Sequence, residues 1–544
     1  MKKTLFRLAG ITIIAAAVCV LSVYGFSQPH ETGLYAPIHE AAGAQEDSGG
    51  VARQAAAFAS PSALHFRTWI ANGKQTVKSF QRKGALCFGG PRDYAAVQGV
   101  SCFRGNNYRD SAGYGTAPVS LQKLKKVWVR PVGRLDSWTG VGWTGQPAIV
   151  KWDEGLIKKM NLYPRYQNHD FKEVIYGALD GKVHFLDLDT GKPTRPPLGT
   201  FGPIKGSVSV DPRGLPVLYV GQGIDTIDQR KIPIGYSVYS LIDQKRLFFI
   251  NGLDGFAPKG WGAFDASGLV HAGTDTLIQT GENGLVYTVK LNTTYIPDHN
   301  VLKVNPEVVK YRYRCSLSKR LGIESSIAVY KNLAYFADND GVLQCLDLNS
   351  LEPVWARCVS DDTDSTVVLE EAGDGVFLYT GCEVDKQVYN GHAYLRKINA
   401  LTGALLWERA YACAYDEKTN GGVLGTPVVG KNNIADLVVF NIARCNEPNG
   451  DKLVALSETN GETVWEIPFS RYSWSSPVDV YTPDGKGYII FCDSGGNMFL
   501  IDGRKGVILD KLYLGGNVEG SPAVYGDMIV VGTRGMQIWG VKIE

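Results

Sequence analysis

Two short acidic segments carry the side chains best suited to binding a cation. They are residues 337–341 (ADNDG) and residues 360–365 (SDDTDS). Carboxylate and amide oxygens are the ligands that Ca²⁺ prefers, but ADNDG lacks the glutamate and the spacing of an EF-hand loop. Similar short segments that end in glycine recur at residues 179–181, 282–284 and 494–496. The sequence therefore favours a tight hairpin turn for ADNDG and a solvated loop for SDDTDS.

No other pattern in the sequence indicates catalysis or a metal centre. The eight histidines are scattered, and none forms the HxH or HExxH spacing that is typical of a zinc site. His184 and His271 fall in or near predicted strands, where a hydrogen-bonded structural role is expected. A GxSxG nucleophile motif is absent from the sequence. We therefore predict no catalytic, cofactor-binding or metal-binding residues.

Cys87 and Cys102 bracket a loop of about fifteen residues near the start of the folded part of the chain. In an oxidising compartment this spacing suits a disulfide that stabilises the fold by about 3 kcal/mol. A metal-binding pair is the alternative, but no second pair of Cys or His accompanies it. The spacing favours the disulfide.

The later cysteines fall into two groups. Those at or just past predicted strand ends are Cys358, Cys382, Cys413 and Cys445, whereas Cys345 and Cys492 lie within apolar strand patterns. One or two disulfides in the first group would pin neighbouring loops, but the sequence does not fix the pairing. The second group is expected to be buried thiols.

A repeat in the sequence predicts the strands that position these residues. It is clearest at residues 343–355 (LQCLDLNSLEPVW), 395–407 (LRKINALTGALLW) and 453–465 (LVALSETNGETVW). Further copies start at Val183 and Met498, and weaker ones near Val238, Val286 and Met536. The steps between starts range from 38 residues (498 to 536) to 58 (395 to 453). Self-similarity at this period, with strands inside each unit, is typical of a β-propeller.

Each repeat accounts for one four-stranded blade. In one repeat the strands are residues 423–430, 434–442 and 452–456 and a fourth strand after Gly461, all rich in β-branched and aromatic residues. The last repeat supplies three strands, and residues 125–133 have the pattern of the missing fourth. We predict an all-β fold: an eight-bladed β-propeller of four-stranded blades over residues 124–544. Its ring is closed by an N-terminal strand in the last blade, which removes exposed sheet edges.

Tryptophans recur at one position of the predicted fourth strands. They are Trp128, Trp355, Trp407 and Trp465. They could form a box around a cofactor, but their repeated position favours structural packing between neighbouring blades. Truncating one of them should then cost on the order of 3 to 5 kcal/mol.

The first 123 residues divide into three parts by composition. Lys2, Lys3 and Arg7 precede an apolar run, which predicts a signal peptide or an uncleaved signal anchor over residues 1–26. Residues 27–62 are rich in Ala, Gly, Glu, Ser and Pro, as in a flexible tether. Residues 63–123 are aromatic and basic, and we name them the strap because they are expected to dock on the propeller. These parts predict an extracytoplasmic protein, either membrane-anchored or secreted.

Three features together resemble the pyrroloquinoline-quinone-like (PQQ-like) repeat propellers, the quinoprotein-type family. They are the repeat itself, the Ser-Pro or Thr-Pro pairs on inner strands at Thr426, Ser476 and Ser521, and the segment FRGNNYRDSAGYG at residues 103–115. The resemblance covers about residues 103–544 and implies one of two kinds of protein. Quinoprotein dehydrogenases hold PQQ and calcium in a central funnel and oxidise alcohols or sugars, whereas non-catalytic members use the blades as a binding surface.

The resemblance favours the non-catalytic branch. Dehydrogenases of this type carry a catalytic Asp, Glu and Asn calcium ligands, an aromatic floor under the quinone and often a disulfide between adjacent cysteines. The sequence contains no Cys-Cys pair, and no stretch aligns residue by residue with those ligands.

Long irregular connections are predicted on one face of the ring. Strand parity places on that face the loop after the second strand of each blade and the loop that leads to the next blade. The long connections that fall there are residues 221–235, 314–322, 360–365, 381–391, 415–422 and 443–450. Because scaffolds carry function on elaborated loops, we predict a binding face near the funnel mouth with Tyr389, Tyr415, Arg444 and Trp474 as contacts.

We therefore expect a non-catalytic binding or scaffolding module of the cell envelope, exported or membrane-tethered, with an envelope protein or a glycan as its partner. One alternative is a dehydrogenase that depends on PQQ and calcium. The other is a glycan- or cell-wall-binding module. The net charge of +2, without basic blocks, gives no reason to expect nucleic acid.

Overall fold

The computed structural model describes residues 59–416, 418–445 and 450–544. The predicted signal segment and all but the last residues of the predicted tether lie outside the described residues. Within the described ranges, no helix is long and apolar enough to cross a membrane.

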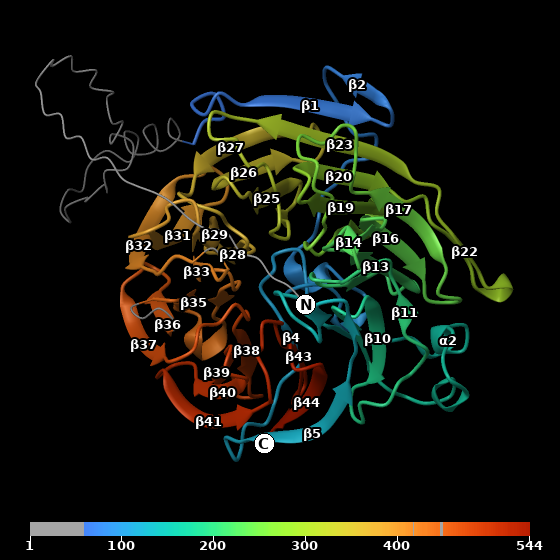
Figure 1. The fold of residues 1–544 in the computed structure, drawn as a ribbon, viewed down its shortest axis with the longest axis vertical. Helices are drawn as coiled ribbons and strands as arrows, with labels where there is room; N and C mark the ends of the chain where they lie inside the picture. The colour runs from blue at the N-terminus through green and yellow to red at the C-terminus, as the bar shows by residue number, and fades with distance from the viewer. Residues whose placement is uncertain (1–58, 417, 446–449) are drawn as a thin grey trace, which may run out of the picture. The chain divides into compact units, whose positions relative to one another are not determined.

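Eight antiparallel sheets follow one another around a central axis, which confirms the predicted eight-bladed β-propeller (Figure 1). From the axis outward, blades 1 to 4 contain β8 (Ala148–Lys151), β9 (Glu173–Gly177), β10 (Lys182–Asp187) and β11 (Leu198–Gly199); β12 (Ser209–Val210), β13 (Val217–Gly221), β16 (Gly235–Ser240) and β17 (Arg246–Asn251); β18 (Leu269–His271), β19 (Thr276–Gly281), β20 (Leu285–Lys290) and β23 (Glu307–Arg314); and β24 (Ala328–Tyr330), β25 (Leu333–Ala337), β26 (Val342–Asp347) and β27 (Glu352–Cys358). Blades 5 to 8 contain β28 (Val368–Ala372), β29 (Gly375–Gly381), β31 (His392–Asn399) and β32 (Leu405–Ala412); β34 (Val428–Val429), β35 (Leu437–Ala443), β36 (Asp451–Ser457) and β37 (Thr463–Phe469); β38 (Val478–Tyr481), β39 (Gly487–Cys492), β40 (Asn497–Asp502) and β41 (Val507–Tyr513); and β42 (Ala523–Tyr525), β43 (Met528–Thr533), β44 (Gln537–Ile543) and β5 (Leu124–Pro131).

Small elements lie in the connections. They are the hairpins β6 (Arg134–Leu135) with β7 (Trp138–Thr139), β14 (Thr226–Ile227) with β15 (Arg230–Lys231) and β21 (Thr294–Ile296) with β22 (Val301–Lys303); the paired strands β30 (Glu383–Val384) and β33 (Gly421–Gly422); the α-helical turn α2 (Glu154–Ile157); and the 3₁₀ turns Pro91–Asp93, Pro164–Tyr166, Ala272–Thr274, Pro297–His299 and Asn432–Ile434.

Strand β5 closes the ring, as the sequence predicts. It pairs antiparallel with β44, and Trp128 lies opposite Gly540 in that register. The first propeller strand in the sequence thus completes the blade formed by the last three, and Figure 1 shows the cyan β5 beside the red β44. Backbone hydrogen bonds within one sheet therefore join the first and the last strands of the propeller.

Each repeated tryptophan lies on the glycine turn of the next blade. The Trp465 indole donates a hydrogen bond from Nε1 to the Gly503 carbonyl at 3.1 Å. A Cβ on Gly506, whose φ is +65°, would lie 2.6 Å from that indole. The same arrangement pairs Trp128 with Gly191, Trp355 with Gly403 and Trp407 with Gly461. The repeat thus builds one interblade contact at four places, and at each of them a glycine is required both by conformation and by space.

Hydroxyl groups join the inner strands into a ring. In most blades, a backbone N–H at the start of the inner strand donates to the Ser or Thr hydroxyl at the same position in the next blade. The pairs, at 2.8 to 3.2 Å, are Gln146 to Ser207, Ser267 to Ser326, Ser326 to Thr366, Thr366 to Thr426, Thr426 to Ser476 and Ser476 to Ser521. These hydroxyls explain why Ser or Thr recurs at this position of the inner strands.

The strap adds strands at two radii of the ring. On the outside, β1 (Arg67–Asn72) pairs with β23 as a fifth strand of blade 3, and β2 (Gln75–Val77) extends that sheet further. Near the axis, β3 (Gln98–Val100) pairs with β8 and β4 (Gly113–Tyr114) with β42. The strap is therefore an integral part of the propeller.

Between β3 and β4, residues 102–111 form a central plug. Arg104 is fully buried and donates to the carbonyls of Pro477 at 2.6 Å and Pro427 at 2.7 Å, in blades 7 and 6. Arg109, also fully buried, donates to the carbonyls of Ile327 at 2.9 Å and Ser267 at 2.7 Å, at the start of blades 4 and 3. The plug thus fastens opposite blades to one another across the axis.

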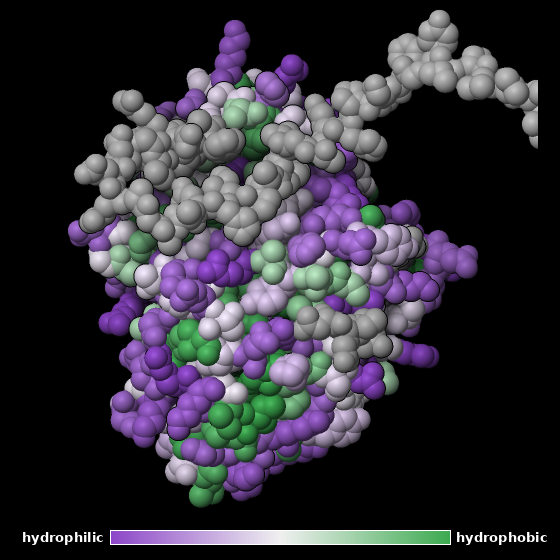
Figure 2. Space-filling view, turned by 90° about the vertical axis from the view of Figure 1, so that its left-hand side faces the viewer, coloured by the Kyte–Doolittle hydropathy of each residue, from purple (hydrophilic) through white to green (hydrophobic). Residues whose placement is uncertain are grey.

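Outward-facing side chains flank the buried tryptophans because strand residues alternate between faces. Val127, Val354, Leu406 and Val464, each just before a tryptophan, are all 44 to 48% exposed. Figure 2 shows hydrophobic side chains among hydrophilic ones on the flank of the ring.

Candidate axial site

One repeated position supplies side chains to the centre of the ring, on the face where the inner strands begin. It lies two residues before the Ser or Thr of the hydroxyl ring, and its occupants are Lys205, Asp265, Glu324, Asp364, Leu424, Trp474 and Glu519 in blades 2 to 8. We call these side chains and their contacts the axial site. The plug lies on its inner side.

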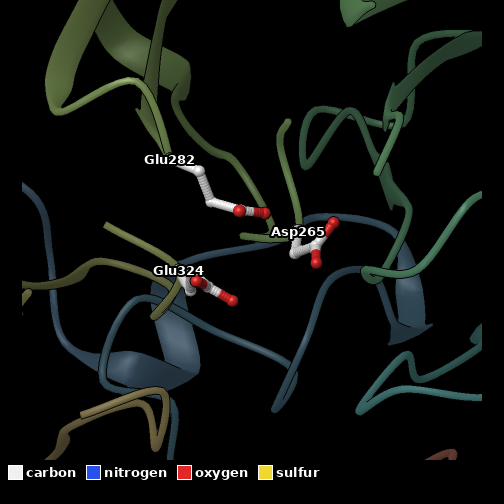
Figure 3. Close-up of side chains that lie close together, drawn as sticks. All are labelled: Asp265, Glu282 and Glu324. Atoms are coloured by element: carbon white, nitrogen blue, oxygen red, sulfur yellow. The ribbon is translucent and has the colours of Figure 1, made fainter. Parts of the chain in front are cut away.

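The first group of carboxyls in this site comes from blades 3 and 4. Asp265, Glu282 and Glu324 each place an oxygen within 4.8 Å of the others, and Figure 3 shows the three carboxyl groups side by side. The Trp261 indole donates from Nε1 to Glu282 Oε2 at 2.6 Å. The other Glu282 oxygen and both Asp265 oxygens are buried and have no hydrogen-bond partner.

The second group comes from the connection before blade 5 and from β30, which follows the second strand of that blade. Asp362, Asp364 and Glu383 again place oxygens within 4.8 Å of one another. Each has one buried oxygen without a hydrogen-bond partner. The Asn420 amide donates to the remaining Glu383 oxygen at 2.8 Å.

Asn339 connects the two carboxyl groups. Its Nδ2 lies 2.7 Å from Glu324 Oε1 and 3.3 Å from Asp362 Oδ2, while its Oδ1 is buried without a partner. The two groups therefore form one continuous acidic wall across blades 3 to 5.

Burial disfavours the charged form of these carboxyls. It raises the pKa of Asp265 from 3.8 to about 6, and it raises the pKa values of Glu282, Asp362, Asp364 and Glu383 well above their usual range. Neighbouring carboxylates add to the increase in each case because like charges repel. Lys205 Nζ lies 3.8 Å from Asp265, and its pKa is raised by the surrounding acids even though burial opposes this.

The acidic wall has the donor set of a hard-cation site. Its oxygens come from carboxylates and one amide, which suit Ca²⁺ in type and flexibility. A buried carboxylate oxygen without a hydrogen bond is costly unless a proton or a cation lies against it. The unpartnered oxygens of both groups therefore fit a bound divalent cation.

Indole and phenol rings form the opposite wall of the axial site. Trp474 packs against Trp143 with ring centroids 5.8 Å apart and against Tyr472 at 5.6 Å. Lys205 Nζ lies 4.3 Å from the centre of the Trp143 ring, in cation–π geometry. Lys205 thus stands between the aromatic wall and the acids.

The four residues that the sequence predicts for the binding face lie in different environments in the structure. Trp474 belongs to the aromatic wall, and Tyr389, 79% exposed, packs edge-on against Tyr415 with centroids 5.8 Å apart at the rim. Arg444 is buried, and its Nη1 donates to the Thr419 carbonyl at 2.7 Å. The residue that follows, Asn420, accepts from Trp474 Nε1 at 3.3 Å through its carbonyl. The rim segment that contains Tyr415, Thr419 and Asn420 therefore contacts the other three residues, and Arg444 supports it from below.

The prediction of a solvated loop for SDDTDS is wrong. Asp361 is fully buried and Asp362 is 7% exposed. The Asp361 carboxylate accepts backbone N–H groups from Asp385, Lys386 and Gln387, so it holds the neighbouring loop in place. The segment turns toward the axis, which brings Asp362 and Asp364 into the acidic wall.

ADNDG forms the predicted tight turn. The Asp338 carboxylate accepts the N–H groups of Asp340 and Val342 at 3.0 and 2.8 Å. The same turn also presents Asn339 to the axial site, which the sequence pattern does not predict.

No disulfide joins Cys87 and Cys102 in the structure. Cys87 is exposed at the surface, and its carbonyl lies 3.1 Å from His271 Nε2. Cys102 is buried in the hydrophobic core at the start of the plug, where burial raises the pKa of its thiol. The two thiols thus lie in different environments.

The carboxyls of the axial site were missed because they are far apart in sequence. Asp265, Glu282, Glu324 and Glu383 each look like a single acid in a loop. Alignment of the repeats on the inner-strand Ser or Thr would have placed four acids and a lysine at one position. That alignment is the signal that could have revealed the site.

No protein-family model matches the chain, and no curated protein sequence matches it. Solved structures with a similar fold include BamB from Moraxella catarrhalis, with 16% identity over 68% of this chain and 93% of that chain and a TM-score of 0.47. A quinohemoprotein alcohol dehydrogenase from Comamonas testosteroni has 12% identity over 83% of this chain and 82% of that chain, with a TM-score of 0.43. A europium-containing methanol dehydrogenase has 11% identity over 82% and 98%, with a TM-score of 0.40.

The raised pKa values predict that stability decreases with increasing pH. A carboxyl whose pKa is higher in the folded than in the unfolded protein binds protons more tightly when folded, so stability is lost between the unfolded and the folded pKa. For Asp265 this window is from about 4 to about 6. In chelator we expect the free energy of unfolding to fall by on the order of 2 kcal/mol from pH 4.5 to 7.

Denaturant unfolding at both pH values measures this change. An Asp265→Asn variant should show a smaller loss because its amide does not titrate. A wild-type protein that is equally stable at pH 4.5 and 7 would contradict the prediction.

Proposed function

We propose that the protein is a cation-dependent binding module of the cell envelope, exported or tethered by residues 1–26. A divalent cation, best matched by Ca²⁺, lies against the acidic wall, and a ligand lies between the cation and the aromatic wall. The buried carboxylate oxygens without hydrogen-bond partners are the observation that carries this proposal.

The charge balance supports the cation. Six carboxyls face Lys205 and Arg320, and Arg320 is itself ion-paired with Asp385 at the rim. At neutral pH these carboxyls either keep their protons, which lowers the stability of the fold by an amount set by their raised pKa values, or are ionised beside a bound cation. A cation bound at either group of carboxyls would release protons from that group and coordinate its unpartnered oxygens.

The two walls together define the chemistry of the ligand. A bound cation and a lysine bind oxygen atoms, whereas indole faces bind apolar ring surfaces. A ligand with a ring face and an oxygen-rich edge, such as a sugar unit of an envelope glycan, fits both walls. A protein partner would instead contact the rim, where Tyr389 is exposed beside Tyr415.

Terbium luminescence tests the cation site directly. Trp261 is hydrogen-bonded to Glu282, so it should sensitise Tb³⁺ bound at the acidic wall. We expect chelator-treated full-length protein to give sensitised emission on titration with Tb³⁺ and to lose it when Ca²⁺ is added in excess. Glu324→Gln should weaken Tb³⁺ binding by about tenfold or more, the size typical of disturbing a metal site.

Glu371→Gln is the matched control, because Glu371 lies on the opposite face and is hydrogen-bonded to Tyr108. It should bind Tb³⁺ like the wild type. Absence of sensitised emission, or an equal loss in both variants, would refute the cation site.

A dehydrogenase that uses PQQ and calcium is the second candidate. The axial site contains Asp, Glu and Asn oxygens beside an aromatic wall, which are the residue types that the family resemblance implies. When bound, the quinone would accept electrons from an alcohol or sugar. Dye reduction in the presence of PQQ, Ca²⁺ and these substrates decides: turnover supports the enzyme, and Ca²⁺-dependent glycan binding without turnover supports the binding module.

A further inference from the structure

Cys413 and Cys445 face each other on adjacent antiparallel segments. They form an isolated β-bridge, in which Cys413 follows β32 of blade 5 and Cys445 follows β35 of blade 6. The neighbouring Ala414 N–H donates to the Arg444 carbonyl at 2.9 Å, which fixes the register of the two segments. Facing residues of an antiparallel pair have Cα atoms about 4.5 to 5.5 Å apart, within the range that a disulfide requires.

The two thiols also interact. The Cys413 thiol, as hydrogen-bond donor, lowers the pKa of Cys445, and the same interaction raises the pKa of Cys413. Cys445 is therefore the better nucleophile of the pair, since thiolates rather than thiols attack disulfides. Both residues are buried, at 7% and 3% exposure.

We infer that Cys413 and Cys445 form a disulfide that links blade 5 to blade 6 at the rim of the axial site. This inference does not depend on the proposed cation. It fixes a pairing that the sequence leaves open among the four rim cysteines. Cys345 and Cys492, buried in separate blades, remain thiols.

The bond forms by exchange with a disulfide donor such as oxidised glutathione. The Cys445 thiolate attacks one donor sulfur, the donor S–S bond breaks, and one glutathione thiolate leaves. Cys413 loses its proton to solvent and attacks the Cys445 sulfur of the mixed disulfide, which releases the second glutathione thiolate. Two protein thiols are oxidised, and one glutathione disulfide is reduced to two thiols.

The disulfide would hold the rim segment that contacts the axial site. This segment begins directly after Cys413. Its Gly422 pairs with Glu383 in the sheet, and Asn420 donates to the Glu383 carboxylate. The link thus supports the acidic wall from outside.

Peptide mapping of the full-length protein tests the inference. The protein is equilibrated with oxidised glutathione, denatured and alkylated without reductant, and then digested with trypsin. Cleavage after Arg409, Lys418, Arg444 and Lys452 leaves Cys413 in residues 410–418 and Cys445 in residues 445–452. We expect these two peptides to appear as one linked species that separates on reduction, while Cys345 and Cys492 are alkylated.

Thermal unfolding gives a second measurement. Reductant should lower the melting temperature of the oxidised wild type by about 4 °C, because the link between residues 413 and 445 is lost. Cys413→Ser should show no change with reductant, whereas Cys345→Ser should keep the decrease. Alkylation of both Cys413 and Cys445 before reduction, or their linkage to other cysteines, would overturn the pairing.

Discussion

Replacing Arg104 by alanine should lower the free energy of unfolding by about 5 kcal/mol. The fully buried guanidinium donates to the carbonyls of Pro427 and Pro477 and, at 3.4 Å, of Arg109. Hydrogen bonds to charged groups contribute about 1.5 to 3 kcal/mol each, and their loss leaves buried carbonyls unpaired. The variant also leaves a cavity at the centre of the ring.

Denaturant unfolding followed by tryptophan fluorescence measures this loss. Arg92→Ala is the control, since Arg92 is an exposed arginine of the same strap, and its effect should stay within about 0.5 kcal/mol. An Arg104→Ala protein that matches this control would mean that the plug does not stabilise the ring.

Replacing Trp465 by alanine should lower the free energy of unfolding by about 3 to 5 kcal/mol. The indole covers the Gly506 turn of blade 7 and donates to the Gly503 carbonyl at 3.1 Å. Truncation removes this contact and leaves a cavity between two blades. Because the contact joins neighbouring sheets, we also expect faster unfolding.

Val464→Ala separates this packing effect from a general effect on the strand. Val464 precedes Trp465 on β37 and is 47% exposed on the outer surface. Its truncation should cost less than about 1 kcal/mol. Equal losses in the two variants, measured by urea unfolding, would contradict interblade packing by the tryptophan.

The fold could be predicted because each repeat in the sequence corresponds to one blade. The glycine turns and tryptophans recur in the sequence, and each reflects a contact between adjacent strands or blades. The path of the strap could not be predicted in the same way. Residues 67–72 pair with β23 more than two hundred residues away, and the Arg104 contacts depend on carbonyls that carry no side-chain signal.

The axial site was less accessible to sequence reasoning than the fold. Strand parity predicts that the long connections lie on one face of the ring, and that the binding face lies there too. The acidic wall was missed, because polarity alone predicts that a run such as SDDTDS is solvated. In the ring this segment points inward, and the fold of blade 5 brings Asp362 close to Glu383, which follows the second strand of the same blade.

Within the residues that the structure describes, the plug lies across the axis of the ring, where Arg104 and Arg109 bind carbonyls of opposite blades. Gly105, Asn106 and Tyr108 of the plug line a separate cavity of about 580 Å³ at the opposite end of the axis. In the described part of the chain, the plug therefore divides the centre of the ring into two compartments. If a ligand binds between the acidic wall and Trp474, as we propose, it would cover the cation site, so the ion would bind before the ligand and leave after it.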